Sequence, residues 1–296
     1  MVVIELVSGI CNSRCKWCFM SYETSHQILK GMISLDNFKK FIDMNSSNPM
    51  PLVPYSHGEA LIHPRFNDMM EYALENNYRL YTIHSNFAMN LTDRHFKNLV
   101  RIENITINIG GITCDIHSEN TGTDLTKVVS NIERLINVKN KTGSNTNIAV
   151  KMLINRNNVK QKKSFPDFVK SIDQSLLSFT RPLYFTTSDS TDEEKMKFYE
   201  DNIGYDNVIE CRDIVGISNG KVVVESKKKN NICTNLFLTI RWNGNVQLCC
   251  RPRKQDGIIG NAFESSINDI MHSEKFKEGY VDVLNREYVS YCKVCS

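Results

Sequence analysis

The chain has 296 residues, of which 41% are hydrophobic and 23% are charged, and this balance excludes a disordered or fibrous protein. Lys and Arg total 36 against 33 Asp and Glu, so the net charge of +3 does not indicate nucleic acid or an anionic membrane as partner. No apolar run approaches the roughly 20 residues that span a bilayer. The first residues (MVVIELV) carry no basic signal region, so we expect a cytoplasmic protein.

Residues 2–186 alternate between apolar segments of strand length and amphipathic segments of helix length. The predicted strands cover 2–7, 52–55, 79–84, 103–109, 148–154 and 182–186. The predicted helices cover 35–45, 66–76, 92–100, 124–138 and 165–176, the first of them with Ser34 as N-cap. This alternation is typical of an α/β protein whose parallel strands are joined by right-handed helical crossovers.

After residue 187 the pattern changes. Residues 188–232 are polar and mixed, with one predicted helix over 191–200, and we interpret them as a linker or insertion. From residue 233 the chain forms a smaller module. There, 236–241 and 245–248 flank the turn Trp242-Asn243-Gly244, which indicates a hairpin, and 265–278 predicts a helix. We therefore expect three regions, 1–187, 188–232 and 233–296.

Ten cysteines without an export signal favour metal ligands over disulfides. Cys11, Cys15 and Cys18 follow the first predicted strand with the spacing C-x3-C-x2-C, on a loop where parallel sheets carry chemistry. Three thiolates on one loop can hold three irons of a 4Fe–4S cubane and leave the fourth iron open to a non-protein ligand. A zinc site completed by a distant His or Cys is the alternative.

This cysteine loop resembles the signature of the radical S-adenosylmethionine superfamily, with Trp17 as the aromatic residue of C-x3-C-x-aromatic-C. A second match, His57-Gly58-Glu59-Ala60, resembles the superfamily's Gly-Gly-Glu-Pro motif, with His in place of the first Gly and Ala in place of Pro. The resemblance implies a partial (β/α)6 TIM barrel and a cluster on Cys11, Cys15 and Cys18 that binds S-adenosylmethionine. It also implies that Gly58 and Glu59 approach the cofactor's methionyl amine, which suits a carboxylate.

Looser matches suggest further cofactor contacts. Ser85 lies where the superfamily has Thr-Asn-Gly and would form a polar wall of the pocket. Asn108 replaces the Ser expected to touch the ribose, and its amide can still hydrogen-bond a hydroxyl. Asn155 is a similar candidate after the fifth strand. The alternative is that these are ordinary loop polar groups. His84 is our candidate proton acceptor, and a structural or solvated histidine is its alternative.

The C-terminal module resembles the SPASM family in its shortened twitch form, and it contains the family's Ile259-Gly260-Asn261. The resemblance implies that Cys233, Cys249, Cys292 and Cys295 fill the coordination of one auxiliary 4Fe–4S cluster, suited to electron transfer or structure. A four-cysteine zinc ribbon is the alternative. Outside both groups, we expect Cys114 and Cys211 to be buried thiols and Cys250 to be a packed or exposed one.

The resemblance implies an enzyme that reductively cleaves S-adenosylmethionine to a 5′-deoxyadenosyl radical, which then abstracts a hydrogen atom from the substrate. An auxiliary cluster that can accept an electron favours net oxidation. Because the cysteine loop begins at residue 11, leaving no room upstream for a leader-peptide-binding domain, we expect a small polyol or sugar-like substrate. The alternatives are a radical enzyme acting on a peptide, protein or polynucleotide, and a non-enzymatic zinc or iron–sulfur protein. The expected redox partner is a flavodoxin- or ferredoxin-type electron donor.

Overall fold

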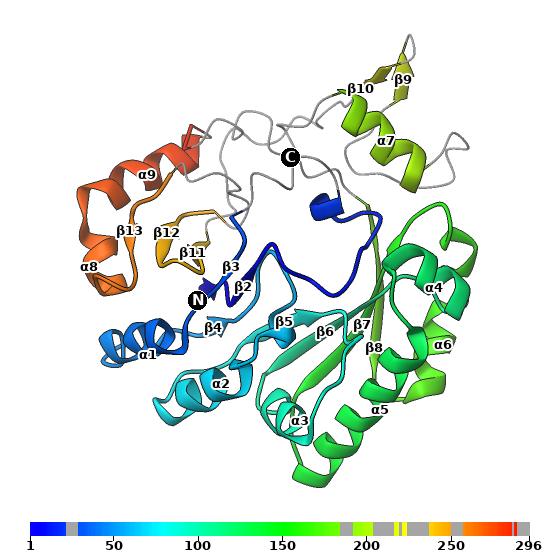
Figure 1. The fold of residues 1–296 in the computed structure, drawn as a ribbon, viewed down its shortest axis with the longest axis horizontal. Coiled ribbons are helices and arrows are strands. Elements are labelled where there is room, and N and C mark those ends of the chain that lie inside the picture. Colours follow the sequence, from blue (N-terminus) through cyan, green and yellow to red (C-terminus); the bar gives the residue numbers. More distant parts are fainter. Residues whose placement is uncertain are drawn as a thin grey trace.

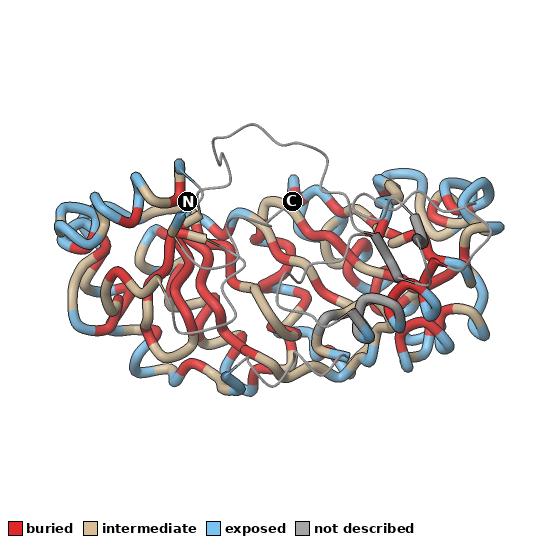
Figure 2. The backbone as a smooth tube through the Cα atoms, turned by 90° about the horizontal axis from the view of Figure 1, so that it is seen from above, coloured by how far each residue is buried: buried red, intermediate tan, exposed pale blue. Residues whose placement is uncertain are grey.

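The computed structural model describes residues 1–21, 29–183, 192–203, 216–218, 221–223, 237–249, 257–285 and 287–288. Its strands follow an arc from β13 through β4 and β5 to β8, and helices α1, α2, α3, α5 and α6 lie along the outer side (Figure 1). Buried residues run through the interior of the molecule, and exposed residues lie mainly on its periphery (Figure 2). This arrangement is an α/β fold, as the sequence predicts.

One half of the arc is a four-stranded parallel sheet. Its strands, in spatial order, are β5 (Thr82–Ser85), β6 (Asn104–Ile109), β7 (Asn147–Ile154) and β8 (Leu177–Pro182). In β7 every second residue from Ile148 to Ile154 is buried. Because side chains alternate between the two faces of a strand, one face packs against the helices and the other carries the remaining side chains, Lys151 among them.

The other half of the arc is centred on β1 (Val2–Ile4). This strand pairs in parallel with β4 (Leu52–Val53), and a bridge from Leu52 to Leu80 connects β4 to the segment that precedes β5. Six parallel strands, β1, β4 and β5–β8, thus follow one another in chain order, as in a partial barrel. A short antiparallel pair, β2 (Val7–Ser8) with β3 (Gly31–Met32), follows β1.

The C-terminal hairpin extends the same sheet. Strand β11 (Leu238–Ile240) pairs in parallel with the free side of β1, and β12 (Asn245–Gln247) and β13 (Gly260–Asn261) continue outward in antiparallel pairs. The predicted turn is confirmed. Gly244 at its end has a φ of +88°, and a Cβ there would lie 2.4 Å from Oδ1 of Asn261. The turn therefore requires glycine.

Helices connect and cover these strands. They are α1 (Leu35–Met44), α2 (Phe66–Glu75), α3 (Asp93–Leu99), α4 (Cys114–Thr121), α5 (Leu125–Thr142), α6 (Phe165–Ile172), α7 (Asp192–Asn202), α8 (Ile267–His272) and α9 (Glu274–Asn285). The 3-10 turns are η1 (Phe19–Ser21), η3 (Ala60–Ile62) and η4 (Val159–Gln161), and β9 (Gly216–Ser218) pairs with β10 (Lys221–Val223). Ser34 caps α1 by accepting a 3.1 Å hydrogen bond from Asn37 N, as predicted.

Several predicted boundaries were wrong, and helix α4 was not predicted. The first strand divides into β1 and β2, which are separated by the buried residues Glu5 and Leu6. The last predicted helix is two helices that divide at Ser273, which lies in extended conformation. Strand β8 begins ahead of the predicted range 182–186, the later part of which lies outside the described residues. A turn in which Asp173 accepts hydrogen bonds from Ser175 ends the preceding helix early.

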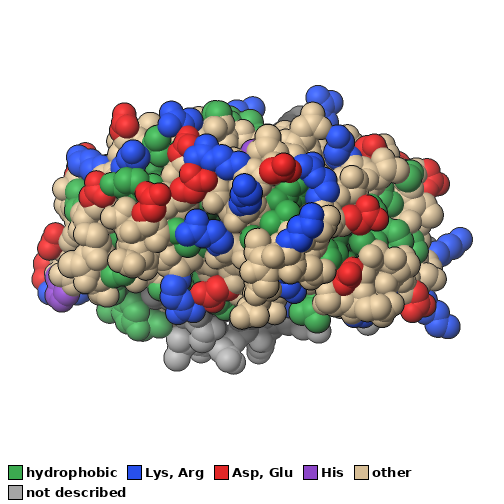
Figure 3. Space-filling view, turned by 90° about the horizontal axis from the view of Figure 1, so that it is seen from below, with side chains coloured by type: hydrophobic (Ala, Val, Ile, Leu, Met, Phe, Trp, Pro, Cys, Tyr) green, Lys and Arg blue, Asp and Glu red, His purple; other side chains and the backbone are tan. Residues whose placement is uncertain are grey.

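None of the described helices combines the length and hydropathy that a membrane span requires. The face of the molecule shown in Figure 3 mixes Lys and Arg side chains with Asp and Glu side chains. This mixture agrees with the small net charge of +3. The surface therefore gives no field of a single sign on that face, and any electrostatic recognition must come from a local site.

The pairing of β11 with β1 generates a stability prediction. Ile240 is fully buried at the end of β11, so Ile240→Ala should lower the free energy of unfolding by about 2–5 kcal/mol. Val281→Ala is the matched control, because Val281 is 53% exposed on α9. Denaturant unfolding of proteins with equal iron content measures both. Equally small effects would show that the hairpin contributes little to the stability of the sheet.

Candidate active site

The cysteine loop (residues 9–18) and the Gly-Glu loop (residues 56–59) are joined through their backbones. Gly9 N donates a 2.6 Å hydrogen bond to the carbonyl of His57, and Glu59 N donates a 3.1 Å hydrogen bond to the carbonyl of Ile10. A Cβ on Gly58 would lie 2.8 Å from the carbonyl oxygen of Ile10, so only glycine permits this approach. The structure therefore brings together the two loops that the sequence singles out.

The three thiols of the cysteine loop influence one another. Burial raises the pKa of Cys11 to about 11, and the nearby Glu59 and Cys18 act in the same direction. Burial and the neighbouring Cys18 and Cys11 likewise raise the pKa of Cys15. Two donors, Ser13 N at 3.4 Å and Asn86 Nδ2 at 3.6 Å, point at Sγ of Cys11.

Sulfur ligands on one loop, with N–H donors to a sulfur, fit an iron–sulfur cluster, whose irons would offset the repulsion between the thiolates. Among the residues that the structure describes, no three His, Cys, Asp or Glu side chains converge on one metal ion. The cysteines of a cubane bind different irons. The donor set of the loop is therefore compatible with the predicted cluster.

Glu59 is buried and bridges two loops. Its Oε1 accepts a 3.1 Å hydrogen bond from Leu61 N, and its Oε2 accepts a 2.9 Å hydrogen bond from Asn86 N, just after β5. Burial raises its pKa to about 7. The carboxylate thus fixes the Gly-Glu loop against the loop after β5, a structural role that sequence reasoning missed. Each oxygen keeps acceptor capacity for a ligand.

Ser85 and Asn108 lie on neighbouring strands. Ser85 is buried and its Oγ accepts a 3.0 Å hydrogen bond from Phe87 N. Nδ2 of Asn108 donates to the carbonyl of Ser85 at 3.4 Å, and Oδ1 of Asn108 is buried without a hydrogen-bond partner within the described part of the chain. An unpaired buried acceptor of this kind is available to a hydroxyl group.

The remaining candidates lie nearby. The ring of His84 stacks on Tyr55 at 4.5 Å between centroids, and burial with the charge of Lys151 lowers the pKa of His84 to about 4. The imidazole is therefore neutral at pH 7. Trp17 is half-buried against the hydrophobic core. Their expected roles, proton acceptor for His84 and cofactor contact for Trp17, remain predictions.

Helix α4 holds the cysteine loop from the other side. Arg14 N and Lys16 N donate hydrogen bonds of 2.8 and 2.9 Å to the carbonyls of Thr121 and Asn120 at the end of α4. Nζ of Lys16 also forms a 2.7 Å ion pair with Glu119. Cys114, which we expected to be buried, is exposed, because it lies at the start of this unpredicted helix.

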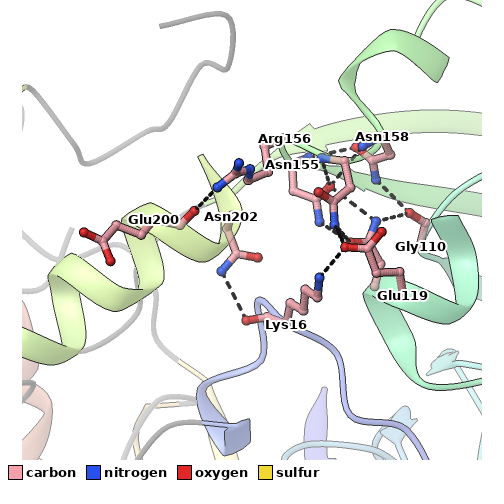
Figure 4. Close-up of polar contacts among 10 residues, drawn as sticks. Lys16, Gly110, Glu119, Asn155, Arg156, Asn158, Glu200 and Asn202 are labelled. Carbon is pink, nitrogen blue, oxygen red and sulfur yellow. Dashed lines mark hydrogen bonds and ion pairs between the residues drawn. The ribbon is translucent and has the colours of Figure 1, made fainter. Parts of the chain in front are cut away.

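A buried asparagine network joins the end of α4 to the segment after β7; its members are Asn120, Asn155 and Asn158, the last two of which are labelled in Figure 4. The amides of Asn120 and Asn155 exchange hydrogen bonds of 2.9 and 3.3 Å, and Nδ2 of Asn120 donates to the carbonyl of Gly110 at 2.7 Å. Asn158 donates to the same carbonyl at 2.9 Å. The side chain of Asn155 is thus engaged inside the protein. The cluster of asparagines at 155–158 was the only sequence signal for this network.

Helix α7, from the region interpreted as a linker, also reaches the cysteine loop. Nδ2 of Asn202 donates to the carbonyl of Lys16 at 3.2 Å. Arg156, after β7, binds the same helix: its backbone N donates to the carbonyl of Asn202 at 2.7 Å and its Nη1 to that of Glu200 at 2.6 Å (Figure 4). Part of the 188–232 region therefore positions the candidate cluster site.

The C-terminal hairpin touches the Gly-Glu loop through a buried charged group. Nη1 of Arg241, just after β11, lies 3.4 Å from Oε1 of Glu5 and 2.9 Å from Nδ1 of His57. Nδ1 of His57 also lies 3.2 Å from Oε1 of Glu5. The hydrogen bond from His57 and the charge of Arg241 hold the pKa of Glu5 below its usual value, although burial opposes this.

Only one of the four expected auxiliary ligands can be placed. Cys249 follows β12 and is half-buried. Outside the described residues lie Cys211, Cys233, Cys250, Cys292 and Cys295. The auxiliary ligand set therefore remains a prediction from the sequence.

Comparisons with known proteins support the two resemblances. Residues 233–296 match the family model of SPASM, an iron–sulfur cluster-binding domain. The tungsten-containing aldehyde ferredoxin oxidoreductase cofactor-modifying protein of Pyrococcus furiosus is 25% identical to this chain. That alignment covers 98% of this chain and 85% of the relative.

Solved structures share the fold over the whole chain. anSMEcpe with bound AdoMet and the Cp18Cys peptide is 18% identical, with a TM-score of 0.60, over 100% of this chain and 86% of that one. BtrN in complex with AdoMet and 2-DOIA is 16% identical, with a TM-score of 0.54, over 100% of this chain and 92% of that one. These findings confirm the resemblance to the radical S-adenosylmethionine superfamily with a C-terminal SPASM domain.

The asparagine network predicts a specific sensitivity. Asn120→Asp keeps the size of the side chain but replaces its donor by an acceptor facing the carbonyl of Gly110, so it should cost about 2–4 kcal/mol of unfolding free energy. Because Lys16 N binds the carbonyl of Asn120, the variant should also retain less iron. Asn137→Asp on the exposed face of α5 is the control. Equal stability and iron content in both variants would contradict the positioning role.

Proposed function

We propose that this protein is a radical S-adenosylmethionine enzyme that catalyses a net oxidation of its substrate. The observation that carries this proposal is the backbone junction between the cysteine loop and the Gly-Glu loop at one edge of the parallel sheet. The match of residues 233–296 to an iron–sulfur domain and the fold shared with AdoMet-bound structures support it. The cofactors proposed are S-adenosylmethionine and two 4Fe–4S clusters.

In this proposal Cys11, Cys15 and Cys18 hold the first cluster and leave one iron for S-adenosylmethionine. When bound there, the two groups supply a one-electron reductive cleavage that leads to hydrogen-atom abstraction from the substrate. The chain's own residues position them. The Gly58–Glu59 segment faces the cluster loop and would receive the methionyl amine. Asn108 offers an unpaired acceptor for a ribose hydroxyl.

The C-terminal domain supports oxidation as the reaction type. Abstraction of a hydrogen atom leaves a substrate radical, which becomes a closed-shell oxidised product by losing one further electron and a proton, so a second electron must leave. We propose that Cys233, Cys249, Cys292 and Cys295 would hold an auxiliary cluster, which would supply a one-electron acceptor for this step. A flavodoxin- or ferredoxin-type protein is the proposed donor to the first cluster. The first candidate substrate is a small polyol or sugar-like molecule.

Peptide modification is the second candidate function. A structure that shares the fold over the whole chain contains a bound peptide. The first candidate is favoured by the fold shared with BtrN, whose structure contains the small molecule 2-DOIA. Short peptides and sugars, added separately to the reduced protein with S-adenosylmethionine, distinguish the two candidate functions. The class of compound that increases consumption of the cofactor identifies the substrate class.

Cofactor cleavage tests the proposed function. The anaerobically reconstituted protein, reduced with dithionite and given S-adenosylmethionine, should form 5′-deoxyadenosine, which chromatography measures. Cys15→Ala should abolish this product, because it removes one of three cluster ligands. Cys114→Ala is the matched control, since that thiol is exposed and lies outside both cysteine groups. Full activity of Cys15→Ala would contradict the cluster assignment, and bound zinc in place of iron would favour a structural metal protein.

Iron content tests the auxiliary cluster separately. Two cubanes hold about eight irons per chain. Cys292→Ala should therefore lose about half of the iron while Cys114→Ala retains it all. Colorimetric iron and sulfide analysis measures the difference. Unchanged iron in Cys292→Ala would remove the auxiliary cluster and, with it, the proposed electron acceptor.

A further inference from the structure

The face of the β5–β8 sheet that turns away from the helices carries a cationic group of side chains. In β7, Lys151 lies on this face, since its neighbours Val150 and Met152 are buried on the other. The strand register places Lys151 between Asn108 on β6 and Phe179 on β8. Side chains paired in this way lie within contact distance.

Arg181 extends the group along β8. It lies two residues beyond Phe179, so both project from the same face, and its Cζ lies 5.6 Å from the centroid of the Phe179 ring. Burial lowers the pKa of Lys151 to about 8, and the positive charge of Arg181 acts in the same direction. The two cations are therefore close enough to repel each other.

No counter-charge offsets this repulsion in the described structure. Among the described residues, neither Lys151 nor Arg181 forms a hydrogen bond or an ion pair with a carboxylate, and strands β5–β8 contain no Asp or Glu. Two neighbouring cations, one of them largely buried, are costly unless a negative group joins them.

The neighbouring polar groups favour the same kind of ligand. Oδ1 of Asn108 is buried and has no partner in the described part of the chain, so it can accept a hydrogen bond from a hydroxyl or amino group. His84 is neutral beside Lys151 and adds no further charge. A ligand that presents an oxyanion to Lys151 and a hydroxyl or amino group to Asn108 would satisfy both.

We propose that Lys151 and Arg181 form an oxyanion-binding subsite for the substrate beside Asn108. The amide oxygen of Asn108 has two lone pairs, so it can accept a hydrogen bond from a substrate hydroxyl or amino group as well as from the ribose hydroxyl. The proposal rests on the proposed function, because it assigns this face of the sheet to the substrate. It deepens that function by naming the class of substrate: a molecule with a carboxylate or phosphate beside a hydroxyl or amino group. The carboxylate of S-adenosylmethionine has the same chemistry, so the test must distinguish the two sources.

The test measures the reactivity of Lys151 in the full-length protein and does not depend on cofactor cleavage. Trace acetic anhydride acetylates neutral lysines, and mass spectrometry of peptides quantifies each site. The probes are 3-hydroxypropionate and inorganic phosphate, and the uncharged control is propane-1,3-diol. A bound oxyanion raises the pKa of Lys151 and covers its amine, so either probe should slow acetylation several-fold. The exposed Lys97 is the internal control.

A variant and a cofactor arm complete the design. Arg181→Gln should raise the probe concentration needed for half-protection several-fold, and Arg181 is exposed, so the variant should fold. Equal protection by propane-1,3-diol, or none by either anion, would overturn the subsite. S-adenosylmethionine and its decarboxylated analogue form the cofactor arm. If S-adenosylmethionine protects Lys151, the analogue does not, and the probes add no further protection, the two cations bind the carboxylate of the cofactor. That result would overturn their role in binding the substrate. If the protein cleaves S-adenosylmethionine but neither anion protects Lys151, the oxyanion subsite is refuted and the proposed function still stands.

Discussion

The backbone hydrogen bonds between the cysteine loop and the Gly-Glu loop determine where the candidate site lies. They form at the carboxyl edge of the parallel strands, where the loops after β1 and β4 meet. Gly58 is required because any side chain there would press against the carbonyl of Ile10. Glu59 then connects this junction to the loop after β5 through a buried carboxylate. Three loops, each with its own candidate residues, are thereby held as one unit.

The opposite side of the cysteine loop depends on buried amides. The carbonyls at the end of α4 accept hydrogen bonds from the loop, and Asn120, Asn155 and Asn158 fix that end of α4 against β6 and β7. Amide side chains suit this task because they donate and accept without carrying charge. A loop proposed to hold three thiolates would concentrate negative charge, so a neutral scaffold avoids further repulsion.

The two regions of the chain that carry cysteines are joined both by backbone strand pairing and by side-chain contacts. β11 belongs to the same sheet as β1, and Arg241 joins Glu5 and His57 in a buried charged group. A change in the hairpin therefore reaches the Gly-Glu loop through two contacts. The hairpin that leads to Cys249 is thereby fixed to the strand that leads to the cysteine loop.

The sequence alone determined the α/β class, the order of the six parallel strands, the hairpin at Trp242–Gly244 and the cysteine and Gly-Glu loops, because these depend on local periodicity and on short spacings. Only the tertiary structure showed the role of α4, the exposure of Cys114 and the bridging by Glu59. It also revealed groups whose members lie far apart in the chain: Asn120 and Asn155 are 35 residues apart, and Glu5 and Arg241 are 236 apart. No local pattern records such pairs, because the burial that makes them strong arises only when the strands assemble.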